Sequence, residues 1–343
     1  MFWGKEMHKL KRTIWSLLLA AGLLAALAVP AGQPLAFAAE KEVYLGGMPA
    51  GFTLGMDGAQ IVGFCEVLTK EGTRSPAKEA GLEAGDLMLS LGGVRVRSAA
   101  DIDAALAAVG EGREEVVVRR KGERVSASVL PACDAASGRG KLGVLVRDSV
   151  SGIGTVTYIE TGSLRFGSLG HAVAGEDGKS MDLGRGDIFR CSIVDVVRGE
   201  RGRAGELKGV FLNDRKVAVA DKNCEQGIYG YFDRSYDLTA LRRAAVGVQA
   251  RPGAATLYTT VDGVAPREYA IDIVKVDEGS RSNRNFVLKV TDAALLADTG
   301  GIVQGMSGSP ILQDGKLIGA VTHVFLNDPT RGYGIAIGNM LGN

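Results

Sequence analysis

The chain has 343 residues, of which 40 are basic and 39 are acidic, so its formal net charge is +1. This balance excludes functions that depend on a strong overall field, such as non-specific binding to nucleic acid or to an acidic membrane surface. Glycine is abundant, at 49 residues, and the short Val/Ile-rich runs between glycines predict mostly β-structure. The length allows about two ordinary domains after a targeting segment.

Residues 1–39 have the features of an export signal. A basic cluster between Lys5 and Arg12 precedes the apolar run 13–29, and small residues follow at 36–39. This order predicts a signal peptide that is removed on export. The alternative is an uncleaved membrane anchor, because about 17 apolar residues is the lower limit for spanning a bilayer. In both cases the rest of the chain lies outside the cytosol, and only this segment contacts a membrane.

The four cysteines are Cys65, Cys133, Cys191 and Cys224, and they are widely scattered without a CxxC spacing. This pattern argues against a zinc site. We expect the four to be buried small hydrophobic residues, with a disulfide between Cys191 and Cys224 as the alternative that export would permit.

A first domain is predicted at residues 41–132. Within it, residues 75–96 predict a short helical turn, a glycine turn and a strand. Asp101–Val109 has the apolar spacing of an amphipathic helix. The alternating segments 115–118 and 124–130 flank Lys121-Gly122, which predicts a closing hairpin.

The order of these elements resembles the central part of PDZ domains. The residues that carry the likeness are Ser75-Pro76-Ala77, Ala80-Gly81-Leu82, Gly85-Asp86 and Gly92-Gly93. A PDZ domain binds a peptide as an added strand, and backbone N–H groups of a glycine-containing loop hold the terminal carboxylate. The loop predicted for that role consists of Gly51, Phe52, Thr53 and Leu54. The alternative is a small α/β spacer without a ligand.

A second domain is predicted at residues 138–343, after a polar linker. Near its end stands Gly305-Met306-Ser307-Gly308-Ser309-Pro310, followed by two strands joined at Asp314-Gly315. A tight glycine turn that presents a serine is typical of chymotrypsin-like peptidases, because their nucleophile needs close backbone approach to the substrate. We therefore predict Ser307 as nucleophile and the N–H groups of Gly305 and Ser307 as the oxyanion hole. The alternative is an ordinary Gly-Ser turn.

A serine nucleophile needs a base, and the sequence offers few histidines. His8 lies in the export segment, which leaves His171 and His323. His171 lies in a glycine-flanked turn upstream of Ser307, the chain order found in chymotrypsin-like enzymes. His323 lies on the predicted strand after the nucleophile. We predict His171 as the base.

The carboxylate that would orient the base is not fixed by spacing. Asp292 and Asp298 precede the nucleophile, and the candidates near the histidine are Asp177, Asp182, Asp187 and Asp195.

Nearly the whole chain resembles the SpoIVB peptidase family of endospore-forming bacteria. The likeness runs from Thr291-Asp292 through the Ser307 motif to residues 321–329 and 332–334, and it includes Arg147-Asp148-Ser149, residues 152–155 and residues 167–171. It implies a mainly β protein composed of the N-terminal segment, a PDZ-like α/β domain and a chymotrypsin-like double β-barrel. It also implies a triad of Ser307, His171 and Asp292, with Asp298 as the rival acid, and no metal or organic cofactor.

The resemblance implies a serine endopeptidase exported to the space between the two sporulation membranes. Enzymes of this family cleave themselves and a membrane-bound regulator of an intramembrane protease, which leads to late sigma-factor activation. A competing class is an inactive PDZ scaffold on a protease fold. A general quality-control protease of the HtrA type has the same parts, but its PDZ domain normally follows the protease.

Overall fold

The computed structural model describes residues 41–109, 112–175, 180–181, 183–247, 249–277, 279–280 and 282–342. The predicted signal peptide or anchor, residues 1–39, lies outside the described residues, so that prediction stays open. Among the described residues, no helix has both the length and the apolar character needed to cross a membrane. Strands dominate the fold, as predicted.

The strands are β1 (Glu42–Leu45), β2 (Pro49–Phe64), β3 (Val67–Thr69), β4 (Gly72–Arg74), β5 (Leu87–Leu91), β6 (Val94–Arg95), β7 (Glu114–Arg120), β8 (Glu123–Val129), β9 (Ala132–Cys133), β10 (Gly140–Lys141), β11 (Val144–Glu160), β12 (Arg165–Ser168), β13 (Leu183–Val197), β14 (Glu206–Cys224), β15 (Gly227–Phe232), β16 (Arg243–Ala245), β17 (Gly253–Thr259), β18 (Arg267–Val276), β19 (Phe286–Val290), β20 (Pro310–Gln313), β21 (Lys316–Phe325) and β22 (Asp328–Ala336). The helices are α2 (Pro76–Glu79), α3 (Ala99–Ala108), α4 (Ala293–Thr299) and α5 (Ile337–Leu341).

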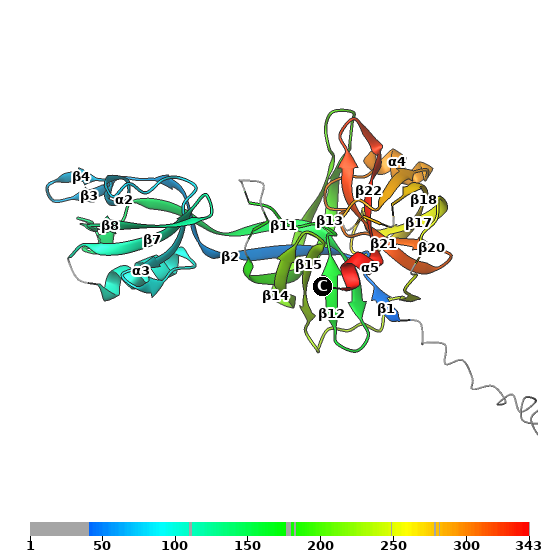
Figure 1. Ribbon diagram of the computed structural model, residues 1–343, viewed down its shortest axis with the longest axis horizontal. Helices are drawn as coiled ribbons and strands as arrows, with labels where there is room; N and C mark the ends of the chain where they lie inside the picture. Colours follow the sequence, from blue (N-terminus) through cyan, green and yellow to red (C-terminus); the bar gives the residue numbers. More distant parts are fainter. Residues whose placement is uncertain are drawn as a thin grey trace, which may run out of the picture. The chain divides into compact units, whose positions relative to one another are not determined.

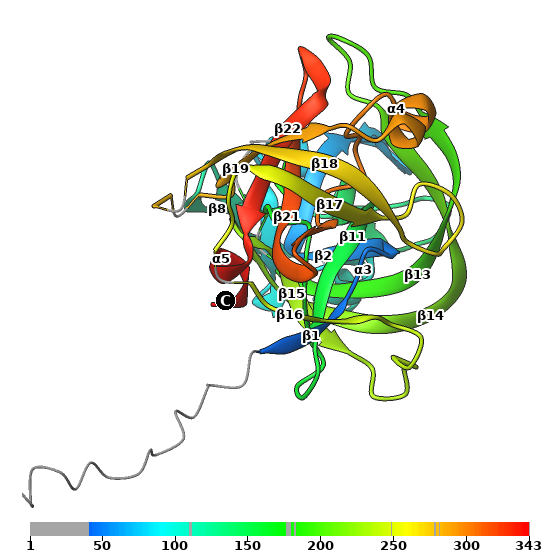
Figure 2. The same ribbon diagram turned by 90° about the vertical axis from the view of Figure 1, so that its right-hand side faces the viewer.

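The C-terminal part of the chain forms a closed barrel in the strand order β17-β18-β19-β22-β21-β20 (Figure 2). β18 and β19 alternate between buried and more exposed residues, and in β18 the side chains of Tyr269, Ile271 and Ile273 point into the core. This period of two is what a sheet with one buried face requires. The barrel carries the Ser307 turn, which lies between α4 and β20.

A second set of strands also closes on itself. β11 pairs with β12, β12 with β15, β15 with β14, β14 with β13, β13 with β2, and β2 again with β11. Phe52, Phe166, Ile188 and Ile228 are buried inside this ring of strands. The loop that carries His171 follows β12, so the two predicted catalytic side chains come from different sheets.

The predicted PDZ elements are present: α2, β5, α3 and the hairpin of β7 and β8 (Figure 1). Lys121 and Gly122 have φ angles of 51° and 92°, so both hairpin residues are left-handed, as a tight turn of type I′ requires. Met88, Ile102 and Val118 are among the residues buried between the helices and this sheet.

The boundary of this domain differs from the predicted range 41–132. β1 pairs with β11 and β16, and its Val43 and Leu45 pack against Tyr158 and Leu317, outside the PDZ elements. Conversely, β11 contributes residues 144–147 as the partner of the PDZ end of β2. Both long strands therefore run from the PDZ elements into the second closed set of strands, which a contiguous domain range cannot describe.

The cysteine prediction is only partly right. All four cysteines are free thiols, so the Cys191–Cys224 disulfide is absent among the described residues. Cys191 is buried, and burial raises the pKa of its thiol, but Cys65 and Cys133 are exposed rather than buried.

The PDZ elements contain a buried ion pair that is expected to control their stability. Nε and Nη2 of Arg120 each donate to the carboxylate of Asp86 at 2.7 Å, and the Asp86 side chain is 1% exposed. Removing one partner of such a pair leaves an uncompensated buried charge, at a cost of about 3–5 kcal/mol.

Arg120→Met should therefore lower the free energy of unfolding by about 3 kcal/mol in urea denaturation. Glu83→Gln is the matched control, because Glu83 bonds to the same guanidinium but its side chain is 61% exposed. Loss of the Glu83 charge should lower the free energy of unfolding by less than about 1 kcal/mol. Equal effects of the two variants would show that burial of Asp86 is not the cause.

Candidate active site

The turn that carries Ser307 depends on its glycines. Gly305 and Gly308 have φ angles of 95° and 94°, a region that L residues rarely adopt. A Cβ atom on Gly308 would lie 2.1 Å from the carbonyl oxygen of Thr155. The glycine-rich motif is thus needed for a tight turn that packs against neighbouring backbone.

Strand β11 holds this turn through three hydrogen bonds. The Thr155 N–H donates to the Ser307 carbonyl at 3.0 Å, and Thr155 Oγ1 donates to the Gly305 carbonyl at 2.8 Å. Thr157 Oγ1 donates to the Gly308 carbonyl at 2.7 Å. Both threonines are buried, so these bonds are shielded from competing water.

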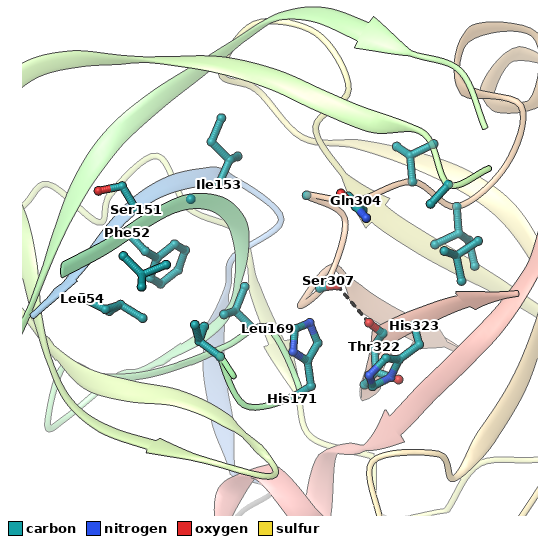
Figure 3. A pocket seen from close by; sticks show the side chains of 18 of the residues that line it. Phe52, Leu54, Ser151, Ile153, Leu169, His171, Gln304, Ser307, Thr322 and His323 are labelled. Carbon is teal, nitrogen blue, oxygen red and sulfur yellow. Dashed lines mark hydrogen bonds between the residues drawn. The ribbon is translucent and has the colours of Figure 1, made fainter. Parts of the chain in front are cut away.

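The bonds direct the carbonyl groups of the turn toward β11 and leave donors available on the turn. Among the described residues, neither the Gly305 N–H nor the Ser307 N–H has a hydrogen-bond partner. Ser307 Oγ itself donates to the Thr322 carbonyl at 2.9 Å (Figure 3). The structure thus places the predicted nucleophile and both predicted oxyanion donors on one turn.

His171 is positioned by the same strand. The loop after β12 passes through Leu169 and Gly170, which have φ angles of 63° and 69°, and the Leu169 N–H donates to the Thr155 carbonyl at 3.3 Å. His171 Nδ1 lies 2.8 Å from the Ala172 carbonyl oxygen. Because a carbonyl only accepts, we assign the proton to Nδ1, which leaves Nε2 free to accept a proton.

The imidazole of His171 is kept neutral by its surroundings. Burial lowers the pKa of His171 below its usual range, although the hydrogen bond to Ala172 opposes this shift. A neutral ring is the form that can act as a base. In Figure 3 the ring lies between Leu169 and His323, beside the Ser307 turn.

The other histidine, His323, lies in the same cavity. Its ring centroid is 5.0 Å from that of His171. Burial, followed by the charges of His171 and Arg284, lowers the pKa of His323 to about 4. Its Nδ1 is buried and has no hydrogen-bond partner in the part of the chain that the structure describes. The preference for His171 over His323 as base stays a prediction, because both rings reach the cavity.

Ser307 and His171 line a cavity of about 400 Å³. Most of its other described lining residues are apolar: Phe52, Leu54, Val150, Ile153, Leu169, Val173, Ala204, Ile302, Val303, Val324 and Leu326. An apolar surrounding strengthens electrostatic interactions between a reacting group and fixed donors.

The predicted acid partner does not lie in this cavity. Asp292 is the N-cap of α4: Oδ1 accepts from the Leu295 N–H at 3.0 Å, and Oδ2 accepts from the Ala270 N–H at 3.2 Å. These backbone donors, that of Leu295 first, hold the pKa of Asp292 below its usual range. In this structure Asp292 has a capping role, and its role as the acid of a triad stays a prediction.

The other candidate aspartates that the structure describes do not lie in this cavity either. Asp298 lines a different surface cavity together with Asp195, Arg267 and Tyr269. Asp187 is 3.3 Å from Lys216 Nζ. Asp177 and Asp182 lie outside the described residues. Among the described residues that line the catalytic cavity, none is Asp or Glu.

The predicted peptide-binding loop is wrong. Gly51, Phe52, Thr53 and Leu54 lie within β2, between β11 and β13, so their backbone belongs to a sheet and forms no loop. Phe52 and Leu54 are buried and line the catalytic cavity instead. A local run with one glycine could not reveal this, because strand pairing is set by distant residues.

A different glycine turn lies beside the PDZ helix. A groove of about 190 Å³ runs between α3 and the start of β11, and its lining includes Ala99, Ile102, Leu106 and residues 141–144. Gly143 has a φ of 72°, and a Cβ atom there would lie 2.5 Å from the Cys65 carbonyl oxygen. Among the described residues, the N–H groups of Leu142 and Gly143 have no partner. The hydrophobic-Gly-hydrophobic run 142–144 was the sequence signal that could have identified it.

These features define a serine peptidase with a PDZ domain. Residues 138–341 match the family model of SpoIVB peptidase S55, and residues 67–120 match that of the PDZ domain. Because the first match spans more than half of the 343 residues, the chain belongs to the SpoIVB peptidase S55 family. No curated protein matches the chain. The predicted family and the predicted serine peptidase class are thereby confirmed.

Substitutions at Asp292 separate its two roles. Asn caps a helix about as well as Asp, whereas Ala costs about 1 kcal/mol. If capping is the role, Asp292→Asn should keep peptide hydrolysis within about ten-fold of wild type, and Asp292→Ala should lower the unfolding free energy by about 1 kcal/mol.

The measurements are kcat/KM on a peptide substrate and urea denaturation of both variants. An orienting carboxylate behaves differently, because replacing it by the amide costs about 10⁴ in kcat with the fold intact. A folded but inactive Asp292→Asn protein would therefore restore Asp292 to the triad.

Proposed function

We propose that the protein is a serine endopeptidase in which Ser307 is the nucleophile and His171 its base. The observation that supports this most strongly is that Thr155 bonds to both the Ser307 turn and the His171 loop, which brings the two residues into one cavity. The two-barrel arrangement of the chymotrypsin-like fold is part of the proposal, supported by the closed barrel and the second closed ring of strands.

The proposed reaction is acyl transfer. His171 Nε2 takes the proton of Ser307 Oγ as the oxygen attacks a peptide carbonyl. The resulting oxyanion accepts hydrogen bonds from the N–H groups of Gly305 and Ser307. The imidazolium then gives its proton to the departing amine. Water then attacks the acyl-enzyme as the same ring takes its proton. The imidazolium returns that proton to Ser307 Oγ as the bond between Oγ and the acyl carbon breaks and the acid product leaves. The hydroxyl must first leave the Thr322 carbonyl, to which it donates in the free protein.

The family suggests the biological setting. We propose that the protein is exported to the space between the two sporulation membranes and cleaves itself on its N-terminal side. Its further substrate would be a membrane-bound regulator of an intramembrane protease, which leads to late sigma-factor activation. The alternative is a catalytically inactive PDZ scaffold. Among the residues that the structure describes, the Gly305 and Ser307 N–H groups have no partner, which favours the enzyme because a scaffold would not need such donors.

Ser307→Ala tests the nucleophile, with Ser309→Ala as its matched control. Ser309 belongs to the same motif but is buried, and its hydroxyl is 2.7 Å from Thr259 Oγ1, away from the cavity lining. Ser307→Ala should abolish labelling by a fluorophosphonate probe and lower peptide hydrolysis by about 10³-fold or more, whereas Ser309→Ala should be labelled.

The full-length chain should also shorten at its N-terminal side in the wild type and in Ser309→Ala but not in Ser307→Ala, as read by intact mass. Failure of the wild-type protein to react with the probe or to cleave peptides would favour the scaffold. Labelling of Ser307→Ala at the wild-type rate would show that the nucleophile is another residue.

We propose that the groove beside α3 binds the C-terminus of a peptide, with the N–H groups of Leu142 and Gly143 as carboxylate donors. The peptide would lie along the edge of β11 that faces α3, in the manner of a PDZ ligand. Its role would be to recruit the protein's own chain or its substrate.

Ala99→Trp should block this groove, because Ala99 lines it from α3. The matched control is Ala107→Trp, an exposed alanine of the same helix outside the groove. In fluorescence polarisation with peptides that end in an apolar residue, Ala99→Trp should weaken binding at least about ten-fold and Ala107→Trp should not. Equal binding of amidated peptides would contradict the carboxylate contact.

A further inference from the structure

Five of the apolar side chains that line the cavity come from three chain segments, at residue 204, at 302–303 and at 324–326, and we call this group the apolar end. They are Ala204, Ile302, Val303, Val324 and Leu326. Ile302 and Val303 are 3% and 2% exposed and form fixed walls, whereas Leu326 is 57% exposed and lies at the opening. The Gly202 N–H donates to the Leu326 carbonyl at 2.7 Å, which ties the Ala204 segment to the Leu326 segment.

This apolar end adjoins a free strand edge. β21 pairs with β22 along most of its length but with β20 only over Lys316–Ala320. The next residue, Val321, forms backbone hydrogen bonds with the Ser307 turn. Beyond it along β21, Thr322 and Val324 line the cavity. Among the described residues, no strand covers the cavity side of these two residues. An extended substrate could pair there as an added strand.

We infer that this apolar end binds the side chain of the residue whose carbonyl Ser307 attacks, and that it selects aliphatic residues. The inference rests on the proposed role of Ser307. In this arrangement the attacked carbonyl accepts hydrogen bonds from the N–H groups of Gly305 and Ser307, and the substrate chain lies along β21. The side chain of the residue that carries this carbonyl then lies against Val303, which precedes Gly305 by two residues.

The lining also explains what should be rejected. None of the described residues that line the cavity is Asp, Glu, Lys or Arg. A charged substrate side chain would lose its water here without gaining an ionic partner, which is strongly unfavourable. An aliphatic side chain instead gains free energy in proportion to the apolar area that it buries.

The experiment uses fluorogenic peptides that differ only at the residue whose carbonyl is attacked. With the full-length protein, kcat/KM should be about 100-fold or more higher for Leu than for Glu or Lys. Leu326→Arg places a cation at the opening, and it should lower the Leu-to-Glu ratio at least about ten-fold by raising hydrolysis of the Glu peptide. Leu212→Arg is the matched control, because Leu212 is 44% exposed and lies outside the cavity lining, and it should keep the wild-type ratio.

Fluorophosphonate labelling separates failure of this inference from failure of the proposed function, because the probe reacts with Ser307 without a peptide side chain. Normal labelling with equal hydrolysis of Leu, Glu and Lys peptides would overturn the subsite and leave the nucleophile in place. An unchanged ratio in a normally labelled Leu326→Arg protein would also overturn it. Loss of wild-type labelling would overturn the proposed function, and the subsite with it.

Discussion

The proposed active site depends on the position of Thr155 in β11. Its N–H and Oγ1 hold the Ser307 turn, and its carbonyl accepts the Leu169 N–H from the loop that leads to His171. β11 belongs to one closed set of strands and the turn belongs to the other. Each bond contributes only about 1 kcal/mol to stability, but each is directional. Thr155 therefore fixes the positions of both Ser307 and His171, although their side chains come from different sheets.

The same interactions determine which polar groups remain available for chemistry. β11 binds the carbonyls of Gly305, Ser307 and Gly308, so the turn must direct its remaining N–H groups elsewhere. Among the described residues, the Gly305 and Ser307 N–H groups have no partner, and both residues are half-buried at the cavity, so these donors are accessible from it. The benefit is that the donors are already oriented when charge develops on the substrate.

The sequence predicted best those features that depend on neighbouring residues. The Ser307 turn, the hairpin at Lys121-Gly122 and helix α3 all follow from glycine positions or apolar spacing within short windows. That Gly51–Leu54 form part of a strand was not predictable in this way, because it depends on pairing with β11 about 100 residues away and with β13 about 135 residues away. Asp292 illustrates a different limit, since an aspartate before a helix satisfies the pattern of an N-cap and that of a catalytic acid equally well.

Strands β2 and β11 also explain why the peptidase and the PDZ elements cannot be treated as separable modules. At one end of β11, Val144 and Val146 line the groove beside α3; further along, residues 150–153 line the catalytic cavity and Thr155 holds the Ser307 turn. β2 likewise gives Phe52 to the catalytic cavity and Ile61 to the PDZ core. Deleting the PDZ elements would therefore cut two strands of the catalytic ring, and a loss of activity in such a protein would not measure peptide binding. Substitutions confined to the groove avoid this problem, because they leave the pairing of β2 with β11 intact.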